Sequence, residues 1–293
     1  MYYLLTLFGG MLISVMVVFN GGLNERVGQT PALIIIHALG VLFTLALMLV
    51  KRQKLRLHRL PFYMYLAGLL GLLATVFNNL AFGRISVSAM MALGLLGESV
   101  SSLIADHFGI LDLPRRPFRP QKLWGGLLTL VGILFMWNGF ELIPVLVCLL
   151  AGVTVLTSRL INARQARVNG LLSGTIVHYT VGLAGSVLLF LLTGTSHSLG
   201  YMLGGPIHIY LGGLIGGVIL LISSTCVGKI PSFYMTLTIF VGQVLAGLLL
   251  DMALTQSFPV HTMIGGLFVL VGLSLNLLLD RRYEKKAAAA ANP

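Results

Sequence analysis

Long apolar runs, each of about twenty residues, recur along nearly the whole chain and are separated by short polar or basic segments. A helix needs about 20 apolar residues to cross a hydrocarbon core about 30 Å thick. The alanine-rich end "KKAAAAANP" is low in complexity, and we interpret residues 281–293 as a cytoplasmic tail that is either disordered or an artificial addition to the chain. The pattern predicts an all-α, polytopic membrane protein with ten transmembrane helices, at residues 2–22, 30–50, 62–83, 86–107, 122–138, 142–161, 169–192, 206–227, 231–251 and 261–279.

Composition agrees with a membrane location. Only 9% of the 293 residues are charged and 57% are hydrophobic, whereas soluble domains carry roughly 25% charged residues. The formal net charge of +11 does not indicate a nucleic-acid partner, because Lys and Arg fall between the apolar runs and not along one soluble face. Cys148 and Cys226 lie inside apolar runs and are interpreted as core residues.

The basic residues predict how the helices are oriented, because cytoplasmic loops of membrane proteins are enriched in Lys and Arg. With a cytoplasmic N-terminus, 17 of the 19 basic residues fall on the cytoplasmic side, and only Arg26 and Arg84 fall outside. Both ends of the chain are therefore expected in the cytoplasm. The predicted cytoplasmic set is Lys51, Arg52, Lys54, Arg56, Arg59, Arg115, Arg116, Arg119, Lys122, Arg159, Arg164, Arg167, Lys229, Arg281, Arg282, Lys285 and Lys286.

The chain also contains an internal repeat. Residues 61–106 align without a gap with residues 206–251, so that "LGESVSSLIAD" meets "VGQVLAGLLLD". The repeat divides the chain into a first unit, residues 1–139, and a second unit, residues 140–280, with five predicted spans each. Because five is odd, the second unit must be inverted relative to the first. Inverted repeats with a site at their interface are a recurrent basis for alternating access.

The stretches "AFGRIS" and "LGLLGESVSSLIADHFGIL" resemble the signature of YdcZ-type bacterial inner-membrane proteins. Those proteins belong to the drug/metabolite transporter superfamily, often as single five-helix units, and this chain resembles two fused copies. The second copy is weaker, since Met252 replaces the histidine of the signature. The resemblance implies a ten-helix secondary transporter of the bacterial inner membrane, usually described as an exporter, and it does not supply a substrate.

Glu98 is the strongest candidate for chemistry, because it is the only acidic residue well inside a predicted span. A charge at the centre of a membrane helix costs on the order of 2.5–3.5 kcal/mol, and burial favours the neutral form of a carboxyl. Glu98 is therefore expected to face a wet cavity or to take up a proton, as proton coupling requires. At helical spacing it shares a face with small and polar residues that suit a cavity wall: Met91, Gly94, Ser101 and Ser102.

The second unit carries a neutral counterpart of this residue. Glu98 aligns with Gln243, which keeps the hydrogen-bonding reach and loses the charge. The two units therefore differ where one of them would titrate. The alternative is structural: a protonated Glu98 that only hydrogen-bonds to a neighbouring helix, with Gln243 doing the same.

Further polar residues recur in both units and are candidates for the substrate cavity. His37 aligns with His178 after a short change of offset, and imidazole titrates near 6.5, so either ring could relay protons or contact an anionic substrate. A polar step in the third span of each unit pairs Asn78 and Asn79 with Ser223 and Ser224. For these four residues, hydrogen bonding between helices competes with cavity lining as the role.

Asp106 and Asp251 align with each other at the C-terminal end of a span in each unit, where a negative charge opposes the dipole of its own helix. A compensating group is needed, either a basic loop residue or the N-terminus of a neighbouring helix. We interpret both aspartates as structural anchors or gates and not as substrate ligands.

The motifs of an enzyme are not found: there is no His-Glu-x-x-His zinc motif, no Gly-x-Ser-x-Gly elbow and no P-loop. We expect no metal and no cofactor. The favoured function is proton-coupled antiport of a small molecule outward, in which the proton on Glu98 and the substrate compete for one cavity. A passive channel, a flippase-like subunit and an importer on the same fold remain alternatives, as do a monomer and a homodimer.

Overall fold

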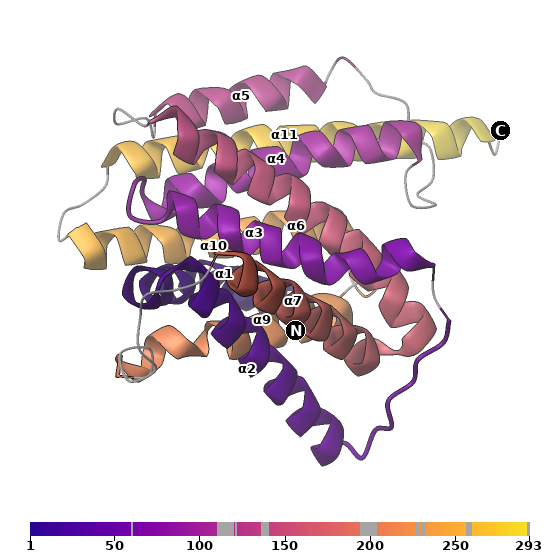
Figure 1. The fold of residues 1–293 in the computed structure, drawn as a ribbon. Helices are drawn as coiled ribbons and strands as arrows, with labels where there is room; N and C mark the ends of the chain where they lie inside the picture. The colour runs from indigo at the N-terminus through magenta and orange to yellow at the C-terminus, as the bar shows by residue number, and fades with distance from the viewer. Residues whose placement is uncertain are drawn as a thin grey trace.

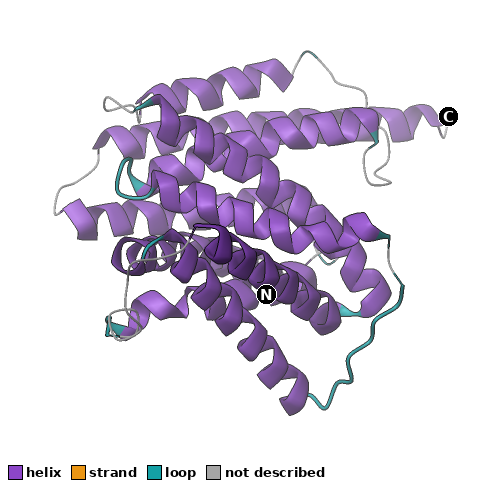
Figure 2. Cartoon of the chain, in the orientation of Figure 1, coloured by secondary structure: helices purple, strands orange, loops and turns teal. Residues whose placement is uncertain are grey.

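The chain folds into a bundle of helices (Figures 1 and 2). Within the described residues it forms no strand, only an isolated bridge between Phe82 and Ile85. The predicted all-α class is therefore confirmed. The computed structural model describes residues 1–59, 61–109, 120, 122–135, 141–193, 204–226, 229, 232–255 and 260–291.

Two successive sets of helices follow one another along the chain. The first set is α1 (Tyr2–Val27), α2 (Gln29–Val50), the short 3-10 helix η1 (Phe62–Tyr65) leading into α3 (Leu66–Ala81), α4 (Val87–Phe108) and α5 (Lys122–Phe135). The second set is α6 (Leu142–Asn169), α7 (Leu171–Thr193), η3 (Ile207–Leu211) leading into α9 (Gly212–Cys226), α10 (Ser232–Thr255) and α11 (Val260–Ala291). Within the described residues, each set thus holds five main helices, which overlap the spans that hydropathy predicts.

Five of the described helices are long and apolar enough to cross a membrane by length and composition. They are α1, α2, the η1–α3 segment Phe62–Ala81, α6 and α7. The other helices carry shorter apolar segments, among them Val87–Ser101 on α4 and Thr238–Leu254 on α10. Many leucines on the outside of the bundle are exposed, as expected for side chains that face lipid, including Leu49, Leu188 and Leu192.

The first helix of each set is longer than predicted. α1 continues to Val27 and α6 to Asn169, where hydropathy had ended the spans at residues 22 and 161. The polar residues in these last turns lower the hydropathy without interrupting the helix. Each helix instead ends at a glycine with positive φ, Gly28 at 86° and Gly170 at 83°, a conformation that other residues rarely adopt.

The expectation of a disordered tail is wrong for most of its length. α11 continues without a break through Ala291, so residues 281–291 prolong the last helix. Alanine has the highest helix propensity of all residues and lysine also ranks high, and a run of low complexity is therefore compatible with a helix.

The two sets of helices pack against each other in a reciprocal pattern. α1 contacts α10 and α9 of the second set, and α6 contacts α4 and α3, the corresponding helices of the first set. Two pairs of corresponding helices also meet directly: α2 with α7, and α5 with α11, which lie side by side in Figure 1.

Glycines bring the backbones of the packed helices into direct contact. A Cβ on Gly152 of α6 would overlap the carbonyl oxygen of Gly94 on α4, and a Cβ on Gly10 of α1 would overlap that of Ile239 on α10. Small residues at helix crossings allow such close approach in membranes. These two contacts correspond to each other in the two sets, which extends the reciprocal pattern from whole helices to single residues.

Candidate functional site

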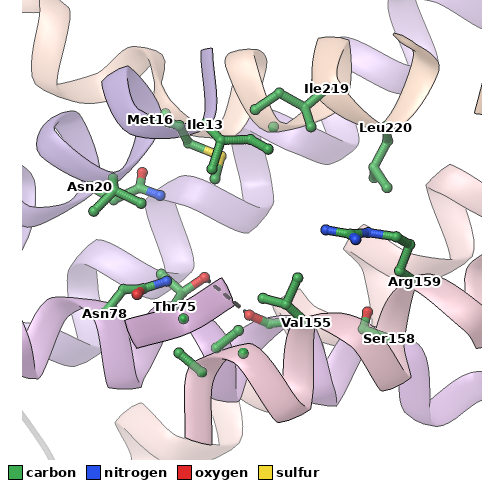
Figure 3. Close-up of a pocket in the computed structure, with 18 of the residues that line it drawn as sticks. Ile13, Met16, Asn20, Thr75, Asn78, Val155, Ser158, Arg159, Ile219 and Leu220 are labelled. Carbon is green, nitrogen blue, oxygen red and sulfur yellow. Dashed lines mark hydrogen bonds between the residues drawn. The ribbon is translucent and has the colours of Figure 1, made fainter. Parts of the chain in front are cut away.

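A cavity of about 220 Å³ lies at the centre of the bundle (Figure 3). Its described lining residues come from α1, α2, α3 and α4 of the first set and from α6, α7, α9 and α10 of the second, while α5 and α11 contribute none of them. Pockets for drug-sized ligands measure about 300–1,000 Å³. The cavity is therefore suited to a small ligand that touches both sets of helices.

Glu98 and Arg159 form an ion pair on the wall of this cavity. Arg159 Nη1 donates to Glu98 Oε2 at 2.8 Å, and Nη2 donates to Oε1 at 3.3 Å. Such two-pronged contacts between guanidinium and carboxylate are among the strongest hydrogen bonds in proteins. The Glu98 side chain is 16% exposed and that of Arg159 is 36% exposed. Glu98 therefore faces a cavity, as expected, but it has a partner.

The assignment of Arg159 to a cytoplasmic loop is wrong. Because α6 continues to Asn169, Arg159 lies well inside the helix and its guanidinium points into the cavity (Figure 3). A signal was present in the sequence: position 159 falls inside the predicted span 142–161, and a carboxylate within the membrane generally has a partner of opposite charge.

Next to the ion pair, a polar chain links α3, α6 and α7. Ser158 donates to the carbonyl oxygen of Ala67 at 2.8 Å, and Asn162 Nδ2 lies 3.4 Å from Ser158 Oγ and 3.1 Å from His178 Nδ1. Ser158, Asn162 and His178 all line the cavity. The cavity wall around Arg159 is thus held in place by hydrogen bonds between helices.

A second group of polar side chains lines the cavity away from Arg159. Asn20 and Asn79 are only 5% and 4% exposed, yet Oδ1 of Asn20 and both polar atoms of Asn79 have no hydrogen-bond partner. A buried polar group left unpaired costs about 1–3 kcal/mol. Figure 3 shows Asn20 and the neighbouring Asn78 on one side of the cavity and Arg159 on the other. Both residues line the cavity, but these particular atoms are themselves shielded from solvent.

The structure brings most of the predicted cavity residues together. His37, Asn78, His178, Ser223 and Gln243 all line the same cavity as Glu98 and Asn79. On α4 the described lining residues end at Glu98; Ser101, one turn further on, donates to the carbonyl oxygen of Gly97 at 2.7 Å. The side chains of Ser102, Ser224 and Asp106 lie outside the described part of the structure.

The contacts give His37 a different counterpart from the one expected. His37 packs against Gly182, and Tyr179 packs against Gly40, so the two rings fill equivalent places across the α2–α7 contact. His37 therefore corresponds to Tyr179, and the alignment of His37 with His178 is off by one residue. His37 Nδ1 lies 2.8 Å from the carbonyl oxygen of Leu33, one turn earlier on its own helix.

Asp251 lies at the N-terminus of α4. Its carboxylate accepts hydrogen bonds from the backbone N–H groups of Val87 and Ser88 at 2.8 and 3.1 Å and from the Ser88 hydroxyl at 2.5 Å. The negative charge thus meets the positive end of the α4 dipole. Of the two compensating groups considered for this residue, the N-terminus of a neighbouring helix is present, and Asp251 joins α10 to α4.

Taken together, the apolar helices, the exposed leucines and the polar central cavity indicate a membrane protein with an internal cavity. The chain belongs to the YdcZ family: the family profile described as "Putative inner membrane exporter, YdcZ" matches residues 1–135 and again residues 143–275. Two fused family units account for the two sets of helices. The resemblance found in the sequence is therefore confirmed, and membrane transport is the general function that the family supports.

The chain is similar to proteins of known structure, one of which aligns over nearly its whole length. This one is a crystal structure of a protein that shares 18% sequence identity, with a TM-score of 0.68, and the alignment covers 96% of this chain and 97% of the other. At this identity the likeness concerns the fold alone. No curated protein sequence matches the chain.

Proposed function

We propose that this protein is a secondary transporter that exports a small molecule across the inner membrane and couples its movement to protons through Glu98. The observation that carries the proposal is the Glu98–Arg159 ion pair on the wall of the central cavity. Glu98 belongs to α4 of the first unit and Arg159 to α6 of the second. A proton on Glu98 would thus act on a contact between the two units.

Protonation changes this contact because it removes the negative charge that Arg159 binds. A neutral carboxyl keeps one acceptor oxygen and loses the strong charge-assisted bonds. Arg159 cannot give up its own proton in exchange. The guanidinium would then need another partner, and the contact between α4 and α6 would be weakened by the loss of this ion pair. This is the kind of two-state contact that a transport cycle requires.

An inverted relation between the two units would support transport by alternating access. The reciprocal contacts of α1 with α10 and of α6 with α4 support a two-fold relation between them. With five spans in each unit, that relation would invert one unit relative to the other and place the cavity near the middle of the bilayer. The remaining basic residues still favour ten spans with both termini in the cytoplasm.

The charge of the substrate decides whether proton and substrate move in opposite directions (antiport) or in the same direction (symport). A cation would compete with the proton for Glu98, which gives antiport. An anion would bind to Arg159 together with a proton on Glu98, which gives symport. Symport exports the anion only when the ratio of its concentration inside the cell to that outside exceeds the opposing ratio of proton concentrations, which is about tenfold for each pH unit. In either case a passive channel differs, because it moves its solute without moving protons.

The test is proton movement in proteoliposomes that contain a pH-sensitive dye. Compounds from a library of small metabolites are added one at a time to vesicles with the wild-type protein and to empty vesicles. We expect at least one compound to change the internal pH only when the protein is present. A protein that carries a compound across without any change in internal pH would be a uniporter or a channel, and the proposal would be wrong.

A further inference from the structure

We propose that the substrate is a small organic anion, a carboxylate or sulfonate with a compact apolar body, which replaces Glu98 on the Arg159 guanidinium once Glu98 is protonated. The inference rests on the proposed function, since Glu98 carries the proton. It names the substrate class and sets the sign of the coupling: anion and proton bind together.

The net charge of the cavity selects this class. With His37 and His178 neutral, the described lining residues hold one negative charge, on Glu98, and one positive charge, on Arg159. The empty cavity is therefore neutral, and so is a cavity that holds one proton and one monoanion. A bound cation would leave an excess positive charge, because a guanidinium stays protonated. An unpaired charge away from water is strongly unfavourable, so the anion with its proton is preferred.

The geometry of the ion pair fits the exchange. Glu98 offers Arg159 two oxygens, at 2.8 and 3.3 Å from its two terminal nitrogens. A carboxylate or sulfonate group on a ligand offers the same pair of acceptors to the planar fork of an arginine. Arg159 is also the more exposed partner, and its guanidinium points into the cavity (Figure 3). A ligand can therefore reach it from the cavity.

The other residues that line the cavity indicate what the rest of the ligand is like. Between Arg159 and Asn20, the side chains of Ile13, Ile219 and Leu220 form an apolar wall (Figure 3). Three asparagines, Asn20, Asn78 and Asn79, line the far side of the cavity with amide groups. A ligand that fits has an anionic group, a compact apolar middle and a hydroxyl or amide at the other end. A cavity of about 220 Å³ limits it to a small molecule.

Few other groups near Glu98 can respond to pH. α4 packs against α1, α5, α6, α10 and α11. The described cavity residues of α1 carry no titratable group. The helices α5 and α11 contribute no described lining residue. The helix α6 supplies Arg159. α10 supplies neutral Gln243 at the cavity and Asp251 at the N-terminus of α4. The remaining titratable cavity residues are His37, His178 and Tyr179, on α2 and α7.

Three matched compounds test the substrate class on the purified full-length protein. They are 4-hydroxybenzenesulfonate, its neutral sulfonamide, and 4-hydroxyphenyltrimethylammonium. The sulfonate stays ionised across the pH range used, so any pH dependence of its binding belongs to the protein. Binding is measured by calorimetry in detergent. We expect the sulfonate to bind, and to bind about tenfold more tightly for each unit of falling pH while most Glu98 is ionised, and the other two not to bind.

Variants identify the residues responsible. Glu98→Gln mimics the protonated carboxyl, so its sulfonate binding is expected to be tight and independent of pH. Arg159→Gln is expected to abolish binding, and Arg159→Lys, which keeps the charge and loses the fork, to weaken it by at least about tenfold. Arg84→Gln and Glu141→Gln serve as controls, because that pair is 3.8 Å apart and its side chains are 50% and 72% exposed. Both controls should bind as the wild type does.

Three results would overturn the inference. If the ammonium compound binds and the sulfonate does not, the substrate is not an anion, and weaker binding of the ammonium at low pH would leave proton coupling through Glu98 intact. If the sulfonate binds to Arg159→Gln and to Arg159→Lys as tightly as it binds to the wild type, Arg159 is not its site. A pH dependence that persists in Glu98→Gln would instead contradict the proposed role of Glu98, and the exchange with it.

Discussion

The Glu98→Gln variant is expected to carry substrate without coupling it to protons. A pH difference of one unit is worth about 1.4 kcal/mol per proton, so one coupled proton supports about tenfold accumulation of substrate. Glutamine is nearly the same shape as glutamate and cannot exchange a proton. Accumulation driven by a pH gradient should therefore fall from about tenfold to none, while exchange of labelled for unlabelled substrate continues. Both quantities can be measured in proteoliposomes.

Glu141→Gln is the matched control for this experiment. Glu141 makes the same kind of contact, to Arg84, but at 3.8 Å on the exposed surface, where ion pairs contribute about 0–1 kcal/mol. Its variant should accumulate substrate as the wild type does. Full accumulation by Glu98→Gln would show that another group carries the proton, and loss of both accumulation and exchange would show that Glu98 is needed for transport itself and not for coupling.

Asp251→Ala is expected to destabilise the protein strongly. The buried carboxylate accepts three hydrogen bonds from Val87 and Ser88, and hydrogen bonds to a charged group contribute about 1.5–3 kcal/mol each. Because such contributions are not additive, we expect a loss of about 3–5 kcal/mol in the free energy of unfolding. The alanine leaves two backbone N–H groups and a hydroxyl without an acceptor. Unfolding in detergent, followed by tryptophan fluorescence, measures the loss.

Ser86→Ala provides the comparison for Asp251→Ala at the same end of α4. The Ser86 hydroxyl accepts from the N–H of Ala89 at 3.2 Å as an ordinary N-cap, and removal of such a cap costs about 1 kcal/mol. Asp251→Ala should therefore be clearly the less stable of the two. Equal stability would mean that Asp251 does not anchor α10 to α4, and its burial would need another explanation.

Much of the fold could be predicted from the sequence because the apolar segments that hydropathy identifies are also the segments that form helices. Each predicted span overlaps a helix within the described residues, and the internal repeat anticipated two family units. The ends of α1 and α6 could not be placed, since polar residues continue a helix as readily as apolar ones do. Only the backbone conformations of Gly28 and Gly170 show where these helices stop.

The site was predicted in part, for a similar reason. A single carboxylate in an apolar segment is conspicuous, and Glu98 does face a cavity. Arg159 was missed because counting basic residues near a helix end treats each of them as a loop residue. The counterpart of His37 was misplaced because sequence alignment cannot fix a one-residue offset between helices, whereas the contacts of Gly40 and Gly182 can.

The protonation of Glu98 itself is the most direct measurement of the central claim. Infrared difference spectra of the reconstituted protein, recorded as the buffer is changed from mildly alkaline to mildly acidic with 4-hydroxybenzenesulfonate present, report the carbonyl stretch of a protonated carboxyl. If Glu98 leaves the Arg159 guanidinium and takes up a proton, the band appears in the wild type and in Glu141→Gln. The band is then missing in Glu98→Gln. A band of equal size in Glu98→Gln, or no band in the wild type, would contradict the mechanism.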